Sequence, residues 1–204
     1  MRWVREARFR EDLLRLVGEA AMTVFHTDDD VYFRTPGAFE LRDNDVCFSL
    51  RLGLNVTYSY SLDVEQRLVG ASVVGDRVAW DWRSQVAGEF SYPLAVNGHV
   101  FRTDEVSDWL ARAEFTNPNT LESALQYFNP DAGPRMASFR HSVVVSIPAN
   151  LVNETNVNRH GDLGTADALN DRFLAGERID VRKMDFSAVR SPHQEISFVF
   201  SPAA

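Results

Sequence analysis

The residues best placed for acid–base chemistry are one histidine and the acidic run after it. His26 is followed closely by Asp28, Asp29 and Asp30. Carboxylates held close together raise one another's pKa and attract cations, so the segment is a candidate for general acid–base catalysis or cation binding. The alternative is that the aspartates are exposed to solvent in a polar segment that follows a helix. The chemical reading predicts a hydrolase or a metal-dependent enzyme.

The remaining histidines and the single cysteine lack the spacing of ligands. The five histidines stand at positions 26, 99, 141, 160 and 193, without a His-x-x-x-His pair and without a neighbouring cysteine. One cysteine excludes an internal disulfide and a cysteine-based metal cluster. We expect Cys47 to be a small, partly buried structural thiol. No metal, no cofactor and no catalytic residue is assigned from these residues.

A three-residue motif late in the chain resembles a phosphatase signature. Arg159, His160 and Gly161 resemble the Arg-His-Gly triplet of histidine phosphatases, in which the histidine takes the phosphoryl group. In that family the triplet follows an apolar first strand near the start of the domain. Here it follows the polar segment 153–158, so the phosphatase function is not transferred to this chain.

Aromatic side chains form a second candidate site. On a curved sheet closed by a helix, they would line the pocket of a small-molecule-binding β-cup or barrel, with or without cyclase- or isomerase-like activity. Aromatic residues at strand spacing on an apolar face are more often part of a core. The candidate ligand-binding residues are Tyr58, Tyr60, Trp80, Trp82 and His99.

Charge and composition narrow the classes of partner. The formal net charge of −8 argues against nucleic-acid binding, which requires a basic surface. The sequence has no apolar run of about 18 residues and no signal-peptide h-region, which predicts a cytoplasmic protein without a membrane span, or a virion protein if the source is viral. Lys183 is the only lysine, and this preference for arginine is typical of GC-rich bacteria and their viruses.

The first hundred residues predict one helix and then an antiparallel meander. Apolar residues recur at helical spacing over residues 5–25, and the meander extends over residues 30–102. Three two-residue turns are expected, at Gly75-Asp76, Asp43-Asn44 and Asn97-Gly98. The apolar pairs that they place opposite one another are Val73 with Val78, Ala71 with Trp80, Val69 with Trp82, Leu41 with Val46, Phe39 with Phe48, Leu94 with Phe101 and Val96 with His99.

Residues 46–65 pose a special problem because every even position is apolar. A two-residue turn at Gly53 would require the apolar positions to change parity, and they do not. The pattern predicts either one long strand bent at Gly53 or a hairpin whose loop has an odd number of residues. The opposite face, from Cys47 to Ser61, is small and polar, with Arg51 as its one charge.

After residue 102 the pattern changes from strands to short helices. Thr103 is expected to cap a helix that buries Val106, Trp109, Leu110 and Ala113, and Asn119 to open a second helix within the helical insertion 103–128. A strand is predicted at 139–147 and a long polar loop at 148–165. A helix from Thr165 to Ala175 precedes two last strands near 179–186 and 195–201.

These elements predict a single β-dominated α+β domain over residues 1–204, arranged as a sandwich or a partly closed barrel with an N-terminal helix and short central helices. The leading functional hypothesis is a non-enzymatic structural or assembly subunit, such as a virion component, with other protein subunits as partners through self-association. It rests on the β-rich meander, the long strand, the polar loop and the lack of converging catalytic residues. The β-cup is the alternative.

Overall fold

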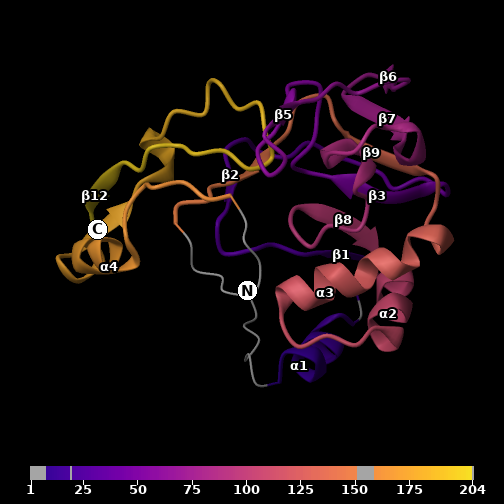
Figure 1. Ribbon diagram of the computed structural model, residues 1–204, viewed down its shortest axis with the longest axis horizontal. Helices are drawn as coiled ribbons and strands as arrows, with labels where there is room; N and C mark the ends of the chain where they lie inside the picture. Colours follow the sequence, from indigo (N-terminus) through magenta and orange to yellow (C-terminus); the bar gives the residue numbers. More distant parts are fainter. Residues whose placement is uncertain (1–7, 19, 151–158, 204) are drawn as a thin grey trace.

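The computed structural model describes residues 8–18, 20–150 and 159–203. It is a mixed α+β fold dominated by sheet, as predicted (Figure 1). The α-helices are α1 (Phe9–Leu16), α2 (Thr103–Arg112), α3 (Pro118–Leu125) and α4 (Ala166–Leu174). The strands are β1 (Met22–Val24), β2 (Asp30–Tyr32), β3 (Asp45–Ser49), β4 (Tyr58–Ser59), β5 (Val64–Glu65), β6 (Ser72–Val74), β7 (Arg77–Asp81), β8 (His99–Arg102), β9 (Arg135–Phe139), β10 (Val144–Ser146), β11 (Glu177–Ile179) and β12 (Phe200–Pro202).

Six strands form one mixed sheet in the order β1-β8-β3-β9-β7-β6. The central strands β3 and β9 pair in parallel, and all other neighbours pair antiparallel. This order differs from the predicted meander, because only β6 and β7 are neighbours both in the sequence and in the sheet. The sheet is open, with β1 and β6 at its edges.

The predicted long strand at 46–65 is wrong in both of its forms. β3 ends at Ser49, and the chain leaves the sheet through turns before β4 and β5 form a two-residue ladder of their own. All five residues of β3 are buried, and a bulge between Asp45 and Cys47 interrupts the alternation of faces. Cys47 is 0 % exposed, so its face is core and not a polar surface. Gly53 approaches the backbone of Ser142 closely, which ties this turn to the start of β10.

One of the three predicted hairpins is confirmed. β6 and β7 pair with Val73 opposite Val78, and Gly75 adopts the positive φ of +60° that this turn requires. The turn at residues 43–44 exists, but the chain before it is not a strand, although Phe39 stacks on Phe48 with ring centroids 4.7 Å apart. The hairpin at residues 97–98 is wrong, because β8 pairs with β1 and β3 instead.

Helices cover one face of the six-stranded sheet. The predicted helix at 5–25 is too long: α1 ends at Leu16 and residues 22–24 form β1, while residues 1–7 and 19 lie outside the described part. α2 buries the predicted face, but Thr103 makes no capping bond. α3 starts two residues earlier than expected, because Asn117 accepts the cap bond from Thr120 N–H. Together α1, α2 and α3 pack their apolar side chains on β3, β7, β8 and β9.

The C-terminal third departs most from the prediction. The strand at 139–147 is two strands, β9 and β10, because the chain turns between them, and residues 151–158 of the long loop lie outside the described part. α4 is confirmed, with Thr165 as its cap. The predicted strands at 179–186 and 195–201 are mostly wrong: they overlap β11 only at Ile179 and β12 only at Phe200 and Ser201, and β11 pairs with β12. We call α4, β11 and β12 the C-terminal lobe; it stands to one side of the sheet (Figure 1).

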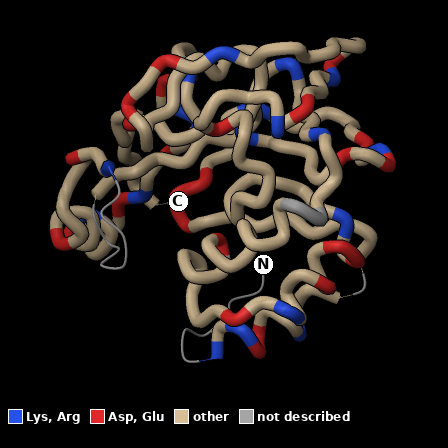
Figure 2. The backbone as a smooth tube through the Cα atoms, turned by 45° about the vertical axis from the view of Figure 1, so that its right-hand side comes forward, with Lys and Arg blue, Asp and Glu red and all other residues tan. Residues whose placement is uncertain are grey.

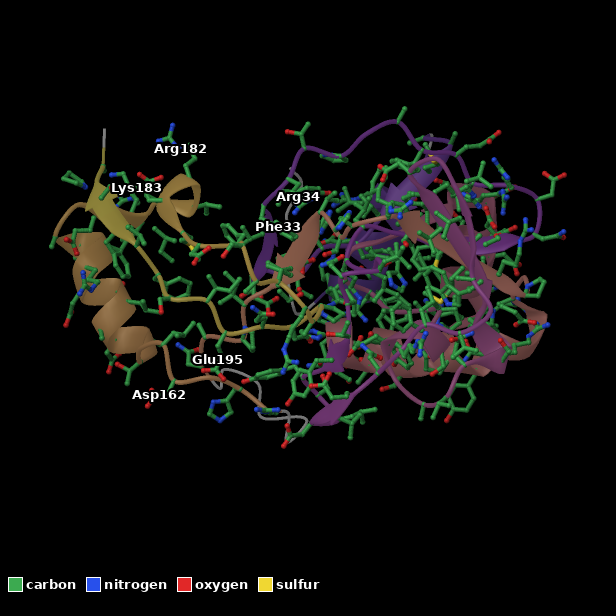
Figure 3. All side chains as sticks on the ribbon, turned by 90° about the horizontal axis from the view of Figure 1, so that it is seen from above. Phe33, Arg34, Asp162, Arg182, Lys183 and Glu195 are labelled. Atoms are coloured by element: carbon green, nitrogen blue, oxygen red, sulfur yellow. The ribbon has the colours of Figure 1, made fainter. Side chains whose placement is uncertain are left out.

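A separate apolar cluster joins the C-terminal segment to β2 and β10. Phe33, which follows β2, stacks on Phe186 with ring centroids 5.4 Å apart. Figure 3 places Phe33 between the lobe and the main sheet. Val145, Ile147 and Ile196 are buried in this cluster, so the base of the lobe is anchored even though its tip is exposed.

Candidate functional site

The first candidate site lies at the surface where β2 begins. Nδ1 of His26 lies 2.9 Å from Oδ2 of Asp30, and Nε2 lies 2.8 Å from the hydroxyl of Tyr32. Because a carboxylate only accepts hydrogen bonds, Nδ1 donates to Asp30, and the Tyr32 hydroxyl is the partner of Nε2. In such an arrangement the carboxylate orients the imidazole, and the imidazole can accept a proton from the hydroxyl. The structure therefore brings together two residues of the predicted acid–base segment.

The other two aspartates of this segment do not join the pair. Asp28 is exposed, and burial raises the pKa of Asp29, whose carboxylate accepts a hydrogen bond from a threonine in the same turn. Burial also works to raise the pKa of Asp30, but hydrogen bonds from His26 and Ser146 outweigh it and the pKa is lowered. Asp30 is thus stabilised as the carboxylate that orients the histidine.

A chain of hydrogen bonds leads from Asp30 into the interior. The pairing of β2 with β10 places Asp30 opposite Ser146, whose hydroxyl donates to Oδ1 of Asp30. Nδ2 of Asn97 donates to the Ser146 hydroxyl at 3.3 Å and to Nε2 of His193 at 3.2 Å. Since Nε2 of His193 accepts this bond, its ring proton is on Nδ1. The surface pair and a buried histidine therefore belong to one polar network.

A buried ion pair lies next to this network. Nη2 of Arg51 lies 2.8 Å from Oε2 of Glu89, and the two residues are 3 % and 7 % exposed. The hydroxyl of Ser59 donates to the other carboxylate oxygen at 3.2 Å. The stem of Arg51 packs on Gly98, where a Cβ would lie 3.4 Å from Cβ of Arg51. The pair is thus held between the segment after β3 and the start of β8.

Two histidines stay neutral beside this ion pair. His99 is 0 % exposed, and its Nδ1–H donates to the carbonyl oxygen of Pro93 at 3.1 Å. Burial, reinforced by the charge of Arg51, lowers the pKa of His99 to about 3 and that of His193 to about 4. We call Arg51, Glu89, His99 and His193 the Arg51 cluster.

Only one member of the Arg51 cluster, His99, was a candidate from the sequence. Arg51 is the one charged residue on the small polar face from Cys47 to Ser61, and this isolated charge was the signal that could have identified it. Glu89 lies in a polar segment without a comparable signal. A buried charge needs a partner, but the sequence does not say which acid supplies it.

The predicted ligand-binding tyrosines lie together, on the hairpin of β4 and β5. The guanidinium of Arg159 donates to the Tyr58 hydroxyl at 2.7 Å and lies 4.2 Å from the ring centroid of Tyr60. The hydroxyl of Tyr60 donates to Glu195 at 2.8 Å. The side chain of His160 is exposed, and its Nδ1–H donates to the carbonyl oxygen of Gly161 at 2.8 Å. Within the Arg-His-Gly triplet, Arg159 is the residue that contacts the hairpin of β4 and β5.

The predicted tryptophans lie elsewhere, in the core beneath the helices. Trp80 is buried and its indole N–H donates to the carbonyl of Phe90 at 2.9 Å, while that of Trp82 donates to Gly133 at 2.8 Å. Both indoles are thus satisfied by backbone. Of the five predicted lining residues, the tyrosines and the tryptophans form separate groups, and His99 belongs to the Arg51 cluster.

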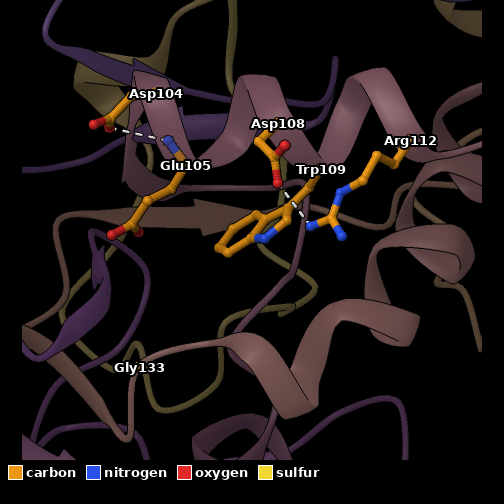
Figure 4. Close-up of a pocket in the computed structure, with 6 residues that line it drawn as sticks. All are labelled: Asp104, Glu105, Asp108, Trp109, Arg112 and Gly133. Carbon is orange, nitrogen blue, oxygen red and sulfur yellow. Dashed lines mark hydrogen bonds and ion pairs between the residues drawn. The ribbon is translucent and has the colours of Figure 1, made fainter.

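A surface groove of about 460 Å³ lies along α2 (Figure 4). Nη2 of Arg112 lies 2.7 Å from Asp108, and Trp109 forms part of the floor. None of the predicted ligand-binding residues lines this groove. Within the described ranges, no group of three or more histidine, cysteine or acidic side chains is arranged to hold a metal ion.

No protein-family model, curated protein or solved structure gives a significant match to this chain. In the described part of the chain, no helix combines the length and the apolar character that crossing a membrane requires.

Proposed function

We propose that the protein is a non-enzymatic structural subunit that associates with copies of itself through the C-terminal lobe. The observation that carries the proposal is that none of the residues of α4 is buried by the part of the chain that the structure describes. Phe173 and Leu174 on α4 are 54 % and 72 % exposed, and Ile179 on β11 is also exposed. Neighbouring exposed apolar side chains of this kind are typical of an interaction surface.

The lobe also lacks the means to be stable alone. A helix shorter than about 12–15 residues and an isolated two-stranded sheet are each marginal in water. Arg178 lies 3.9 Å from the ring centroid of Phe173 and Arg172 lies 4.2 Å from that of Phe200, so two arginines partly cover the rings. A second subunit would cover Leu174 as well, and full burial of such a side chain contributes about 1.5–3 kcal/mol.

The charge distribution supports a protein partner. Basic and acidic residues are interspersed over the fold (Figure 2), and the net charge of −8 disfavours nucleic acid. In Figure 3, Arg182 and Lys183 lie on one side of the lobe and Asp162 lies on the other; both basic side chains also lie 3.4 Å from Asp180 of the same chain. A repeating particle in the cytoplasm, of cellular or viral origin, is the setting that we propose.

The test is the molar mass of the purified chain by light scattering over a wide concentration range. We expect an oligomer for the wild type and a monomer for Leu174→Glu, because the new carboxylate would have to be buried in the interface. Tyr127→Glu is the matched control, since Tyr127 is 84 % exposed but lies outside the lobe. A wild-type monomer at every concentration, or an unchanged mass for Leu174→Glu, would contradict the proposal.

A further inference from the structure

Four buried nitrogen atoms of the Arg51 cluster have no hydrogen-bond partner among the residues that the structure describes. They are Nε and Nη1 of Arg51, Nε2 of His99 and Nδ1 of His193. Buried polar atoms nearly always have partners, and each unsatisfied one costs about 1–3 kcal/mol. Four would cost on the order of 4–12 kcal/mol, which is comparable to the whole stability of a typical domain. The cluster therefore has the character of a binding site.

The four atoms differ in what they require of a ligand. Nε and Nη1 of Arg51 only donate, and Nδ1 of His193 carries the ring proton because its Nε2 accepts from Asn97. Nε2 of His99 is a bare acceptor, because Nδ1 donates to Pro93. The cluster thus presents three donor nitrogens and one acceptor. A ligand that satisfies all four is rich in acceptor oxygens and has one O–H group.

We propose that the Arg51 cluster binds a small oxyanion that carries one proton, such as hydrogen phosphate or bicarbonate. Its hydroxyl donates to Nε2 of His99, and its other oxygens accept from Arg51 and His193. A guanidinium is well suited to this task because its planar N–H groups match the geometry of oxyanions. This binding site is independent of the lobe, so it goes beyond the proposed structural role.

The charges of Arg51 and Glu89 nearly cancel at the site. Glu89 already offsets the charge of Arg51, because its carboxylate lies 2.8 Å from the guanidinium. Both histidines are neutral donors or acceptors and not cations. The ligand is therefore selected by matching hydrogen bonds more than by net charge, and the pattern of donors decides which oxyanion fits.

The experiment is a calorimetric titration of the full chain with inorganic phosphate, bicarbonate and sulfate at constant ionic strength and neutral pH. Sulfate resembles phosphate in size but has no proton to donate to His99. We expect phosphate to bind at least about tenfold more tightly than sulfate, the effect of one lost hydrogen bond to a buried acceptor. Equal binding of phosphate and sulfate, or no binding of phosphate and bicarbonate, would overturn the proposal.

Variants locate the site. His193→Gln removes the ring Nδ1–H while keeping a neutral polar side chain, and we expect it to weaken phosphate binding about tenfold. His160→Gln is the matched control, because His160 is exposed, and its affinity should equal that of the wild type. If His193→Gln fails to fold, a high-resolution structure of the wild type grown in phosphate decides the question. Water alone at Nη1 of Arg51, or equal affinity in both variants, would overturn the assignment.

Discussion

Removal of Glu89 should destabilise the protein strongly, because it leaves Arg51 as an unpaired buried charge. Breaking a buried pair by removing one partner costs about 3–5 kcal/mol. No other described side chain bonds the Arg51 guanidinium, and the Ser59 hydroxyl also loses its acceptor, which adds about 1 kcal/mol. Glu89→Ala should therefore lose about 4–6 kcal/mol of unfolding free energy, measured by urea denaturation monitored by tryptophan fluorescence.

A surface pair of equal length provides the control. Arg190 and Glu65 also lie 2.8 Å apart, but both side chains are exposed, so Glu65→Ala should cost less than about 1 kcal/mol. The double variant Arg51→Met, Glu89→Leu removes both charges and should be more stable than Glu89→Ala alone. The reasoning is refuted if Glu89→Ala costs no more than Glu65→Ala, or if the double variant is the less stable of the two.

Two further predictions concern the same interior. The folded-state pKa values of His193 (about 4) and His99 (about 3) lie below the unfolded value of about 6.5, so their contribution to stability is complete above pH 6.5 and is lost as the pH falls. Between pH 6 and 4 the unfolding free energy should fall by up to about 1.4 kcal/mol per pH unit for each histidine. If the unfolding free energy of His193→Gln depends on pH as steeply as that of the wild type, the prediction is contradicted. Gly53→Ala should lower the unfolding free energy by about 1–3 kcal/mol in urea denaturation, because its Cβ would lie 2.7 Å from the backbone nitrogen of Ser142. Gly18→Ala is the control and should leave the unfolding free energy nearly unchanged, because Gly18 has open surroundings. Equal losses in the two variants would disprove the close approach.

The parts of the fold that were predicted correctly depend on neighbours in the sequence. The hairpin of β6 and β7 follows from a two-residue turn, and the buried face of α2 follows from helical spacing. The contact of His26 with Asp30 is of the same kind, since the two residues are four apart. Local patterns of this type are decided by backbone geometry, which the sequence states directly.

The parts that were wrong depend on contacts between distant segments. The alternation in residues 46–65 predicts one exposed face, but β3 is central in the sheet and both of its faces are buried. One face packs in the cluster beneath the helices, and the other in a second cluster to which the distant residues Val143 and Val144 belong. The ion pair of Arg51 with Glu89 joins the turn after β3 to a short 3-10 helix at Glu89–Ser91, and neither segment has a periodic signal. A charged residue on a polar face gives the same sequence pattern whether its side chain is exposed to solvent or buried.

The parallel pairing of β3 with β9 has a consequence for how the chain folds. Phe48 and Ala137 are partners although they lie roughly 90 residues apart, and closing a loop of that length costs about 4 kcal/mol of chain entropy. During synthesis β3 cannot pair with β9 until the chain has been synthesised as far as Phe139, the last residue of β9. Folding should accordingly be slow for a domain of this size, and the apolar residues of β3 are the segment that most needs protection from aggregation until β9 arrives.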